Sequence, residues 1–421
     1  MIELTGNRRQ FLTGLASTAM LPLAPGIAAA RAPQWAATRA LMRRYIDGGK
    51  LAGAIAAIGR GTGDPVFIGE GGIALGDAAP VAPDTIWRIY SMTKPVTGMA
   101  AMMLIEDGRL TLDQNIADFL PGFANPTVLT EPEKSLAARP AARPITIRHL
   151  LTHTAGLGYS IVSKGPLRDA LLRLGLAPIV TRPEPEAGLG TRPSSLAEFA
   201  ERLSVLPLIA DPGTAWSYSH SLDLLGRIIE IASGQPFDAF LKARIFDPLG
   251  MTDTGFTVPA ARLPRLATNY AVDGNGLRPI DYPGHSIFSV PPAFPFGGAG
   301  LVSTARDYDR FLAMLQGEGK LGDKRIMTRE TAQMAMSDIL PEGVTKPNGW
   351  GFGAGGYVTI KDQPGGQSIG TYGWAGAAGT IAWVDRGRRM RGSWFVQYMP
   401  SQTYPLMSEV PEAVYKDIGQ L

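Results

Sequence analysis

A serine and a lysine three residues apart, Ser91 and Lys94, are the pair in this sequence whose types and spacing best suit covalent chemistry. They open a segment that ends at Gly108 and whose apolar residues recur at helical spacing. One face of this segment is therefore expected to be buried. Residues three apart share a face of a helix, so the hydroxyl and the amine can be neighbours. The pair is a candidate activated nucleophile, and the alternative is a helix-capping serine followed by a solvated lysine.

Two further stretches could contribute to the same chemistry. Tyr218 lies in a loop before a helix that is expected to start near Asp223, and such a phenol can turn into a cleft. The alternative is a half-buried core tyrosine whose hydroxyl is hydrogen-bonded. Residues 372–379 are rich in glycine and alanine, which lets a ligand approach the backbone closely and lets a strand N–H act as an oxyanion donor. The alternative there is a plain glycine-rich strand end.

Composition excludes several other functions. The chain has 421 residues, a formal net charge of +3 spread along the sequence, and no cysteine. Disulfides, thiolate catalysis and cysteine-ligated zinc are therefore excluded, and nucleic acid is not an expected partner. No apolar run is long enough for a stable membrane span, and the length allows one large domain or two lobes.

The first 30 residues have the pattern of an export signal. Arg8 and Arg9 form a twin-arginine pattern, an apolar stretch follows over 12–23, and three alanines at 28–30 resemble a cleavage site. The alternative is a basic N-terminal helix. We expect residues 1–30 to be removed on export to a bacterial periplasm, and residues 31–421 to form the mature domain.

The elements that must position these residues can be read from periodicity and turn residues. Strands are expected over 52–58 and 65–73 and at 352–360, 367–372, 379–384 and 393–399, with terminal helices over 34–47 and 405–418. Helices dominate the middle of the chain, at 91–108, 145–156, 195–206, 223–233, 237–246 and 306–315. Segments 124–144 and 158–193 are expected to be surface loops, and 258–300 is rich in proline and glycine.

This order predicts an α+β fold. A mainly antiparallel sheet is built from both ends of the chain and flanked by the terminal helices, and a mostly helical lobe is inserted between its halves. The expected sheet lobe covers about 33–90 and 345–421, and the helical lobe covers about 91–344. A site is expected in the cleft between them.

The three stretches occur in the order used by serine β-lactamases and penicillin-binding proteins. The chain more closely resembles the family VIII carboxylesterases, which have a class C β-lactamase-like fold. The resemblance covers almost all of residues 35–418 and is carried by segments 89–95, 150–157, 216–221, 297–304 and 373–378. It implies a β-lactamase/transpeptidase-like fold and a hydrolase that needs neither a metal nor an organic cofactor.

The resemblance also implies a role for each site residue. Ser91 would take the acyl group, and Lys94 and Tyr218 would share its proton and later activate water; the sequence leaves open which of the two is the base. The oxyanion hole would be formed by the backbone N–H groups of Ser91 and Ala377. Trp374 and Gly376 would line the acyl pocket.

Two departures from the β-lactamase pattern favour neutral esters. Trp374 stands where β-lactamases and peptidases of this fold usually have a lysine for a substrate carboxylate. His220 stands where they usually have an amide that contacts the lactam side chain. We therefore expect a carboxylesterase for small-molecule esters with short acyl chains, with weak β-lactam hydrolysis still possible. The alternatives are a class C-like β-lactamase or D,D-peptidase, and an inactive relative that only binds.

Two other patterns are set aside. Gly366-x-Ser368-x-Gly370 matches the nucleophile elbow of α/β-hydrolases, but all four histidines precede it and a strand, not a helix, is expected after it. His149 and His153 are four residues apart and could share a metal, yet no third ligand is evident. We expect them to be structural histidines near a helix end.

Overall fold

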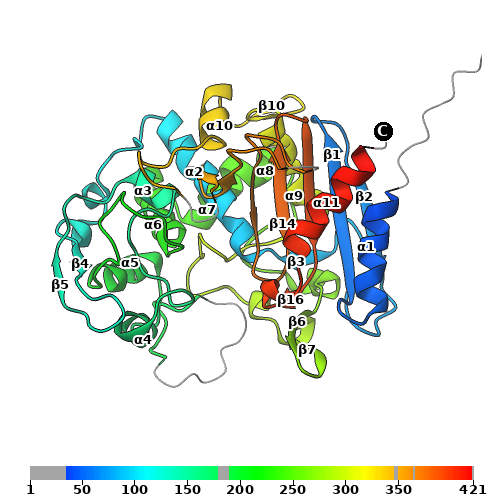
Figure 1. Cartoon of the computed structure of the whole chain (residues 1–421), viewed down its shortest axis with the longest axis horizontal. Helices are drawn as coiled ribbons and strands as arrows, with labels where there is room; N and C mark the ends of the chain where they lie inside the picture. The colour runs from blue at the N-terminus through cyan, green and yellow to red at the C-terminus, as the bar shows by residue number, and fades with distance from the viewer. Residues whose placement is uncertain (1–34, 179–188, 346–348, 364–365, 420–421) are drawn as a thin grey trace, which may run out of the picture.

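The computed structural model describes residues 35–178, 189–345, 349–363 and 366–419. At its centre lies a seven-stranded antiparallel sheet in the order β11-β12-β13-β14-β15-β1-β2 (Figure 1). Its strands are β1 (Gly53–Arg60), β2 (Val66–Gly71), β11 (Gly351–Phe352), β12 (Tyr357–Val358), β13 (Tyr372–Ala375), β14 (Ile381–Asp385) and β15 (Met390–Phe395). β1 pairs with β15, placing Ala56 opposite Trp394, so the sheet joins both ends of the chain. This confirms the predicted fold class.

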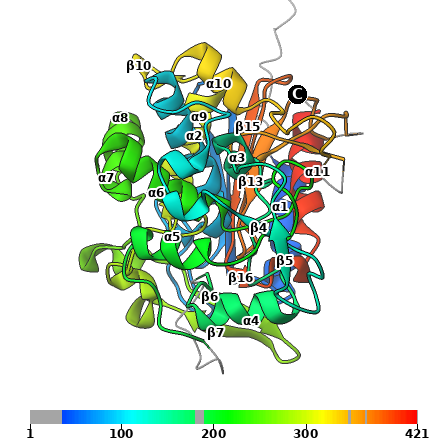
Figure 2. The same ribbon diagram turned by 90° about the vertical axis from the view of Figure 1, so that its left-hand side faces the viewer.

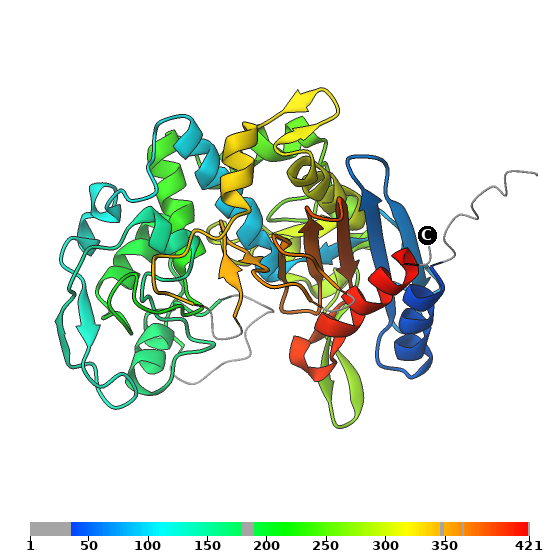
Figure 3. The same cartoon turned by 45° about the horizontal axis from the view of Figure 1, so that its top comes forward.

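The two terminal helices, α1 (Ala36–Asp47) and α11 (Leu406–Ile418), pack together on one face of this sheet, and Figure 3 shows α11 crossing it beside α1. Asp417 joins the two helices. Its carboxylate accepts hydrogen bonds from the N–H of Ala37 at 2.9 Å and from the N–H of Thr38 at 2.8 Å. Because the first N–H groups of a helix have no acceptor within it, this carboxylate completes the start of α1.

The opposite face of the sheet is covered by α9 (Ala305–Gln316), which contacts β1, β14 and β15. Next to it runs α2 (Thr93–Glu106), which also contacts α6 (Ser221–Ser233) in the helical lobe. Every residue of α2 from Thr93 to Leu104 is buried, so the expectation of a single buried face is wrong. A helix between two layers is buried on every side because both layers must exclude water, and most of its buried residues are apolar.

The helical lobe lies on the far side of α2 from the terminal helices (Figures 1 and 2). Besides α6, the helices of the middle of the chain are α3 (Ile147–Leu151), α4 (Gly165–Arg173), α5 (Leu196–Ser204), α7 (Phe237–Leu241), α8 (Asp247–Leu249) and α10 (Arg329–Ala335). Short strand pairs complete the fold: β3 (Ile86–Arg88) with β8 (Val302–Thr304), β4 (Thr127–Leu129) with β5 (Ala138–Pro140), and β9 (Lys320–Leu321) with β10 (Lys324–Arg325).

Several expected loops are structured. Segment 124–144 contains the β4–β5 hairpin, and 158–193 contains α4, whose apolar face is buried. The proline- and glycine-rich stretch holds β6 (Asn269–Asp273) and β7 (Gly276–Asp281), and β6 pairs in parallel with β16 (Tyr398–Met399). Conversely, the expected strand over 367–372 is absent from the described residues there apart from the start of β13.

The predicted export signal at 1–30 lies outside the described residues. Within the described ranges no helix combines the length and apolar character needed to cross a bilayer.

Candidate active site

Ser91 sits in a 3-10 turn, Tyr90–Met92, that leads directly into α2. The preceding residue, Tyr90, has a φ of 41°, in the left-handed region that costs a non-glycine residue about 1–2 kcal/mol. Its buried ring packs edge-on against Phe288, and its hydroxyl accepts a hydrogen bond of 3.1 Å from Asn269. The backbone conformation before the nucleophile is therefore held by a buried side chain.

A buried ion pair anchors the strand just before this turn. The guanidinium of Arg88 pairs with the carboxylate of Asp281, and both side chains are shielded from solvent. The same guanidinium donates to the carbonyl of Ala267 at 2.5 Å, and the backbone N–H of Arg88 donates to Gln397 at 3.3 Å. Removing one partner of such a pair leaves an uncompensated buried charge, so β3 is fixed firmly against β7.

Three side chains predicted to work together meet at the Ser91 hydroxyl. The Tyr218 hydroxyl donates to Ser91 Oγ at 2.6 Å, although the two residues are 127 positions apart. Lys94 Nζ donates to Ser91 Oγ at 3.2 Å and to the carbonyl of Gly298 at 2.6 Å. Lys94 is only 1% exposed, and its Nζ lies 4.5 Å from the ring centre of Tyr218. A hydroxyl flanked by a lysine and a tyrosine can lose its proton, as it attacks, to whichever of the two is deprotonated.

Aromatic rings hold the phenol of Tyr218 in place. Its ring centre lies 4.9 Å from that of His153, 5.4 Å from Tyr159 and 5.8 Å from Trp374. His153 has a φ of 55°, and its carbonyl accepts a hydrogen bond of 2.9 Å from the N–H of Ser217. Burial and the nearby phenol of Tyr218 raise the pKa of Tyr159 well above its usual value, so that hydroxyl stays neutral.

The end of β13 brings the predicted oxyanion and pocket residues to the same place. A Cβ on Gly376 would lie 2.4 Å from the carbonyl of Ile89, so only glycine lets β13 approach the nucleophile turn this closely. Ala377 follows in the turn after β13, and its N–H donates no hydrogen bond to any residue that the structure describes. The N–H of Ser91 lies at the entry to α2, where helical N–H groups have no acceptor within the helix.

Sequence reasoning missed the groups behind Lys94. These are the Gly298 carbonyl and the carboxylate of Asp223, which accepts a hydrogen bond of 2.8 Å from the N–H of Gly298. His220 is fully buried and its Nδ1 lies 3.1 Å from Asp223, so it offers no polar group to a substrate. The one available signal was the position of Asp223, five residues after Tyr218 and on the first turn of a helix.

The patterns that were set aside have structural roles. Ser368 donates to the carboxylate of Asp385, which also accepts a hydrogen bond of 2.6 Å from Tyr415. Nδ1 of His149 accepts a hydrogen bond of 3.1 Å from the N–H of Thr146, and burial lowers the pKa of His149 to about 4. No group of three or more metal-ligating side chains occurs among the described residues.

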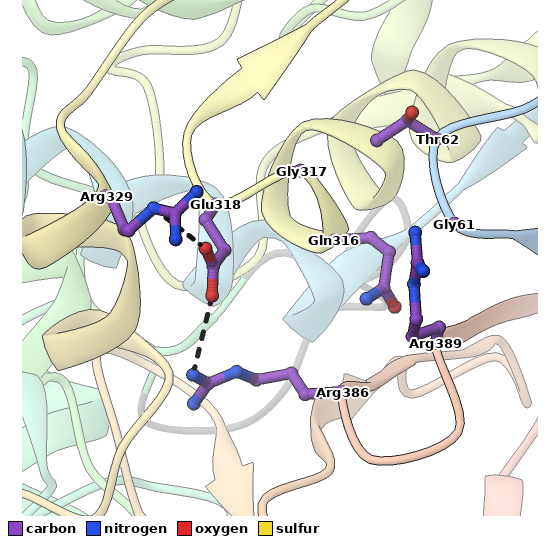
Figure 4. Close-up of a pocket in the computed structure, with 8 residues that line it drawn as sticks. All are labelled: Gly61, Thr62, Gln316, Gly317, Glu318, Arg329, Arg386 and Arg389. Atoms are coloured by element: carbon purple, nitrogen blue, oxygen red, sulfur yellow. Dashed lines mark ion pairs between the residues drawn. The ribbon is translucent and has the colours of Figure 1, made fainter.

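A separate polar pocket lies away from these groups, between the β1–β2 and β14–β15 turns and the end of α9 (Figure 4). There Glu318 pairs with Arg329 at 3.2 Å and with Arg386 at 3.9 Å. No residue that lines this pocket belongs to the group around Ser91.

Comparison with known proteins gives a consistent result. A family model described as Beta-lactamase matches residues 38–416. Esterase EstB of Burkholderia gladioli is 33% identical over 362 residues, covering 80% of this chain and 83% of that protein. Lovastatin esterase of Penicillium rubens is 29% identical over 398 residues, covering 89% and 95%. The solved structure of "EstCE1, a hydrolase with promiscuous acyltransferase activity" is 25% identical, with a TM-score of 0.73 and coverage of 90% of this chain and 97% of that one.

Proposed function

The chain belongs to the beta-lactamase family and is a serine hydrolase that acts on carboxylic esters, and we propose that it cleaves small neutral esters with short acyl chains through an acyl-enzyme on Ser91. One observation carries this proposal. The Ser91 hydroxyl accepts hydrogen bonds from both Tyr218, at 2.6 Å, and Lys94, at 3.2 Å. The nucleophile thus has two groups in reach, and either one can take its proton when that group is deprotonated.

In the acylation step, one member of the Lys94–Tyr218 pair is deprotonated, as the Lys94 amine or the Tyr218 phenolate. That group takes the proton of Ser91 while Oγ attacks the ester carbonyl carbon. The carbonyl oxygen becomes an oxyanion, which accepts hydrogen bonds from the N–H groups of Ser91 and Ala377. The tetrahedral intermediate then collapses, the C–O bond to the alcohol breaks, and the pair returns the proton to the departing alkoxide.

The deacylation step repeats this chemistry with water. The Lys94–Tyr218 pair takes a proton from a water molecule, whose oxygen attacks the acyl carbon. The same oxyanion donors hold the second intermediate, and its collapse releases the carboxylic acid and restores the Ser91 hydroxyl. Burial of Lys94 supports both steps because few solvent molecules compete for its hydrogen bonds.

The preference for neutral esters rests on two side chains. Trp374 lies beside Tyr218 and also packs edge-on against Phe352, with ring centres 5.3 Å apart, so this wall of the site is aromatic. At the position where β-lactamases have a lysine, this chain has the indole of Trp374, which offers a substrate carboxylate no positive charge. His220 is buried against Tyr159 and Phe199 and offers no amide to a lactam side chain.

A side-by-side assay separates the esterase from its alternatives. We expect wild-type protein without residues 1–30 to turn over p-nitrophenyl butyrate with a kcat/KM far above that for nitrocefin, and Ser91→Ala to abolish both activities. Faster turnover of nitrocefin would instead identify a class C-like β-lactamase. Failure to hydrolyse either substrate and failure to form a fluorophosphonate adduct would identify an inactive binding relative. Release of D-alanine from a peptidoglycan-type peptide at a higher kcat/KM than the ester would identify a D,D-peptidase.

We further propose that the protein acts in the periplasm after export by its twin-arginine segment. Arg8 and Arg9 support this proposal. Fractionation of cells that express the full chain should find the enzyme in the periplasm, and Arg8→Lys/Arg9→Lys should retain it in the cytoplasm. Unchanged periplasmic recovery of that double variant would refute the proposal.

A further inference from the structure

A short chain of hydrogen bonds runs from the nucleophile into the core of the helical lobe. Lys94 Nζ, which contacts Ser91, donates to the carbonyl of Gly298 at 2.6 Å. The N–H of the same glycine donates to Oδ1 of Asp223 at 2.8 Å. The other carboxylate oxygen of Asp223 lies 3.1 Å from Nδ1 of His220. Exposure is 1% for Lys94, 3% for Asp223 and 0% for His220, so this chain is sealed from solvent.

The segment that carries the Gly298 carbonyl is held between two helices. On the α6 side, a Cβ on Gly298 would lie 3.0 Å from both carboxylate oxygens of Asp223, and one on Gly297 would lie 2.4 Å from the carbonyl of Leu222. On the α2 side, Thr97 donates to the carbonyl of Gly297 at 2.6 Å. The contact with Leu222 requires glycine at position 297, and a side chain at position 298 would press on the carboxylate of Asp223. The carbonyl of Gly298 therefore has little freedom to move.

The carboxylate of Asp223 is itself supported by His220. A buried carboxylate is stable only when its oxygens accept hydrogen bonds. Here Oδ1 accepts from a backbone N–H, and Oδ2 lies against the imidazole. Nε2 of His220 is buried and has no hydrogen-bond partner among the described residues. This fits a neutral imidazole that donates from Nδ1, because a proton on Nε2 would be an unsatisfied buried donor.

We propose that Asp223, supported by His220, is a positioning residue for the hydrolysis: through Gly298 it holds Nζ of Lys94 beside the Ser91 hydroxyl. The inference rests on the proposed esterase function. Asp223 does not touch the reacting atoms and acts only on where Lys94 stands. A displacement of about 1 Å in a catalytic group can lower a rate about 100-fold, so loss of this support should appear in the chemical step.

The experiment compares Asp223→Ala and Asp223→Asn with the wild type. Active-site titration with a fluorophosphonate gives both the fraction of protein that reacts and the rate constant of the reaction. Asp223→Ala should keep the full reacting fraction, while its labelling rate constant and its kcat for p-nitrophenyl butyrate fall about 100-fold and KM changes little. Asp223→Asn keeps an oxygen acceptor for Gly298, and both rates should fall only about tenfold.

Asp417→Ala is the matched control, because Asp417 is also buried and also accepts backbone hydrogen bonds, at the start of α1. It should lower the melting temperature yet leave the labelling rate constant and kcat unchanged. A merely structural role for Asp223 would reduce the reacting fraction and spare the rate constant, and that result would overturn the proposal.

If Asp223→Ala does not fold, the test uses Asp223→Asn alone. An unchanged labelling rate constant in that variant would also overturn the positioning role of Asp223. Ser91→Ala separates a failure of the proposed esterase function from a failure of the positioning role of Asp223. Ester turnover that survives Ser91→Ala would refute the proposed function, whereas turnover that requires Ser91 but not Asp223 would refute only the positioning role.

Discussion

Replacing Tyr218 by phenylalanine removes one oxygen atom from the centre of the site and little else. The lost hydroxyl is the donor that lies 2.6 Å from Ser91 Oγ. The ring itself is held by its neighbours, with centre distances of 4.9 Å to His153 and 5.8 Å to Trp374, and phenylalanine retains those contacts. Tyr218→Phe therefore tests the chemistry of the phenol with the packing kept nearly constant.

The size of the effect follows from the number of groups around Ser91. General acid–base catalysis by a positioned group contributes about 10²- to 10⁴-fold, so kcat/KM for p-nitrophenyl butyrate should fall within that range. Because Lys94 and Tyr218 serve the same proton, Lys94→Ala/Tyr218→Phe should lose no more than about the worse single variant. The free energy of unfolding should change by only about 1 kcal/mol, the net value of one hydrogen bond.

The assay needs both kinetics and a melting curve, with Tyr398→Phe as control. Tyr398 is buried and its hydroxyl donates at 3.0 Å to the carbonyl of Ser401, so the control loses a similar bond among the residues packed under the terminal helices. It should share the small stability loss and keep full activity. If Tyr218→Phe keeps kcat/KM within about threefold of the wild type, the phenol has no role in proton transfer and the reasoning fails.

Three other predictions concern residues around the site. Gly98→Ala should lower the free energy of unfolding by about 1–3 kcal/mol in denaturant titrations, because its Cβ would lie 2.2 Å from the Ala354 carbonyl; Gly274→Ala, in open space, is the control. Trp374→Lys should raise the ratio of nitrocefin to ester kcat/KM by up to about fivefold, since the carboxylate of nitrocefin gains a cationic partner. An unchanged ratio would contradict the assignment of Trp374 to the wall of the site. His149→Gln keeps an acceptor for the Thr146 N–H and removes a titrating group whose pKa burial lowers to about 4. Below about pH 6.5 the imidazole binds a proton in the unfolded chain but stays neutral in the native wild type. As the pH falls from about 6.5 to 4, the free energy of unfolding of the wild type should therefore drop by up to about 3 kcal/mol more than that of His149→Gln. Equal drops in the two proteins would refute this.

Local signals predicted much of this architecture. The amphipathic pattern of 34–47 and the apolar strands near both ends were enough to place the sheet and its terminal helices. The Ser91–Lys94 pair was found because residues three apart at a helix start are neighbours whatever the rest of the fold does. The helix they open was identified correctly, but its burial on every side was not, because that depends on two layers that local periodicity does not show.

Contacts made across long sequence separations could not be derived from local patterns. The approach of Tyr218 to Ser91 was expected only through resemblance, since 127 residues separate them. The β6–β7 hairpin was missed because Pro279 and its glycines read as loop, and its partner β16 lies more than 100 residues later. The burial of His220 against Asp223 is likewise a property of packing that residue types alone do not reveal.

The central claim, a covalent acyl-enzyme on Ser91, is tested most directly by trapping and locating the adduct. Wild-type protein treated with a fluorophosphonate and mapped by peptide mass spectrometry should carry one adduct, on the peptide that contains Ser91. Ser91→Ala should carry none, and Ser368→Ala should be labelled like the wild type. Labelling of Ser368, or ester turnover by Ser91→Ala, would contradict the account.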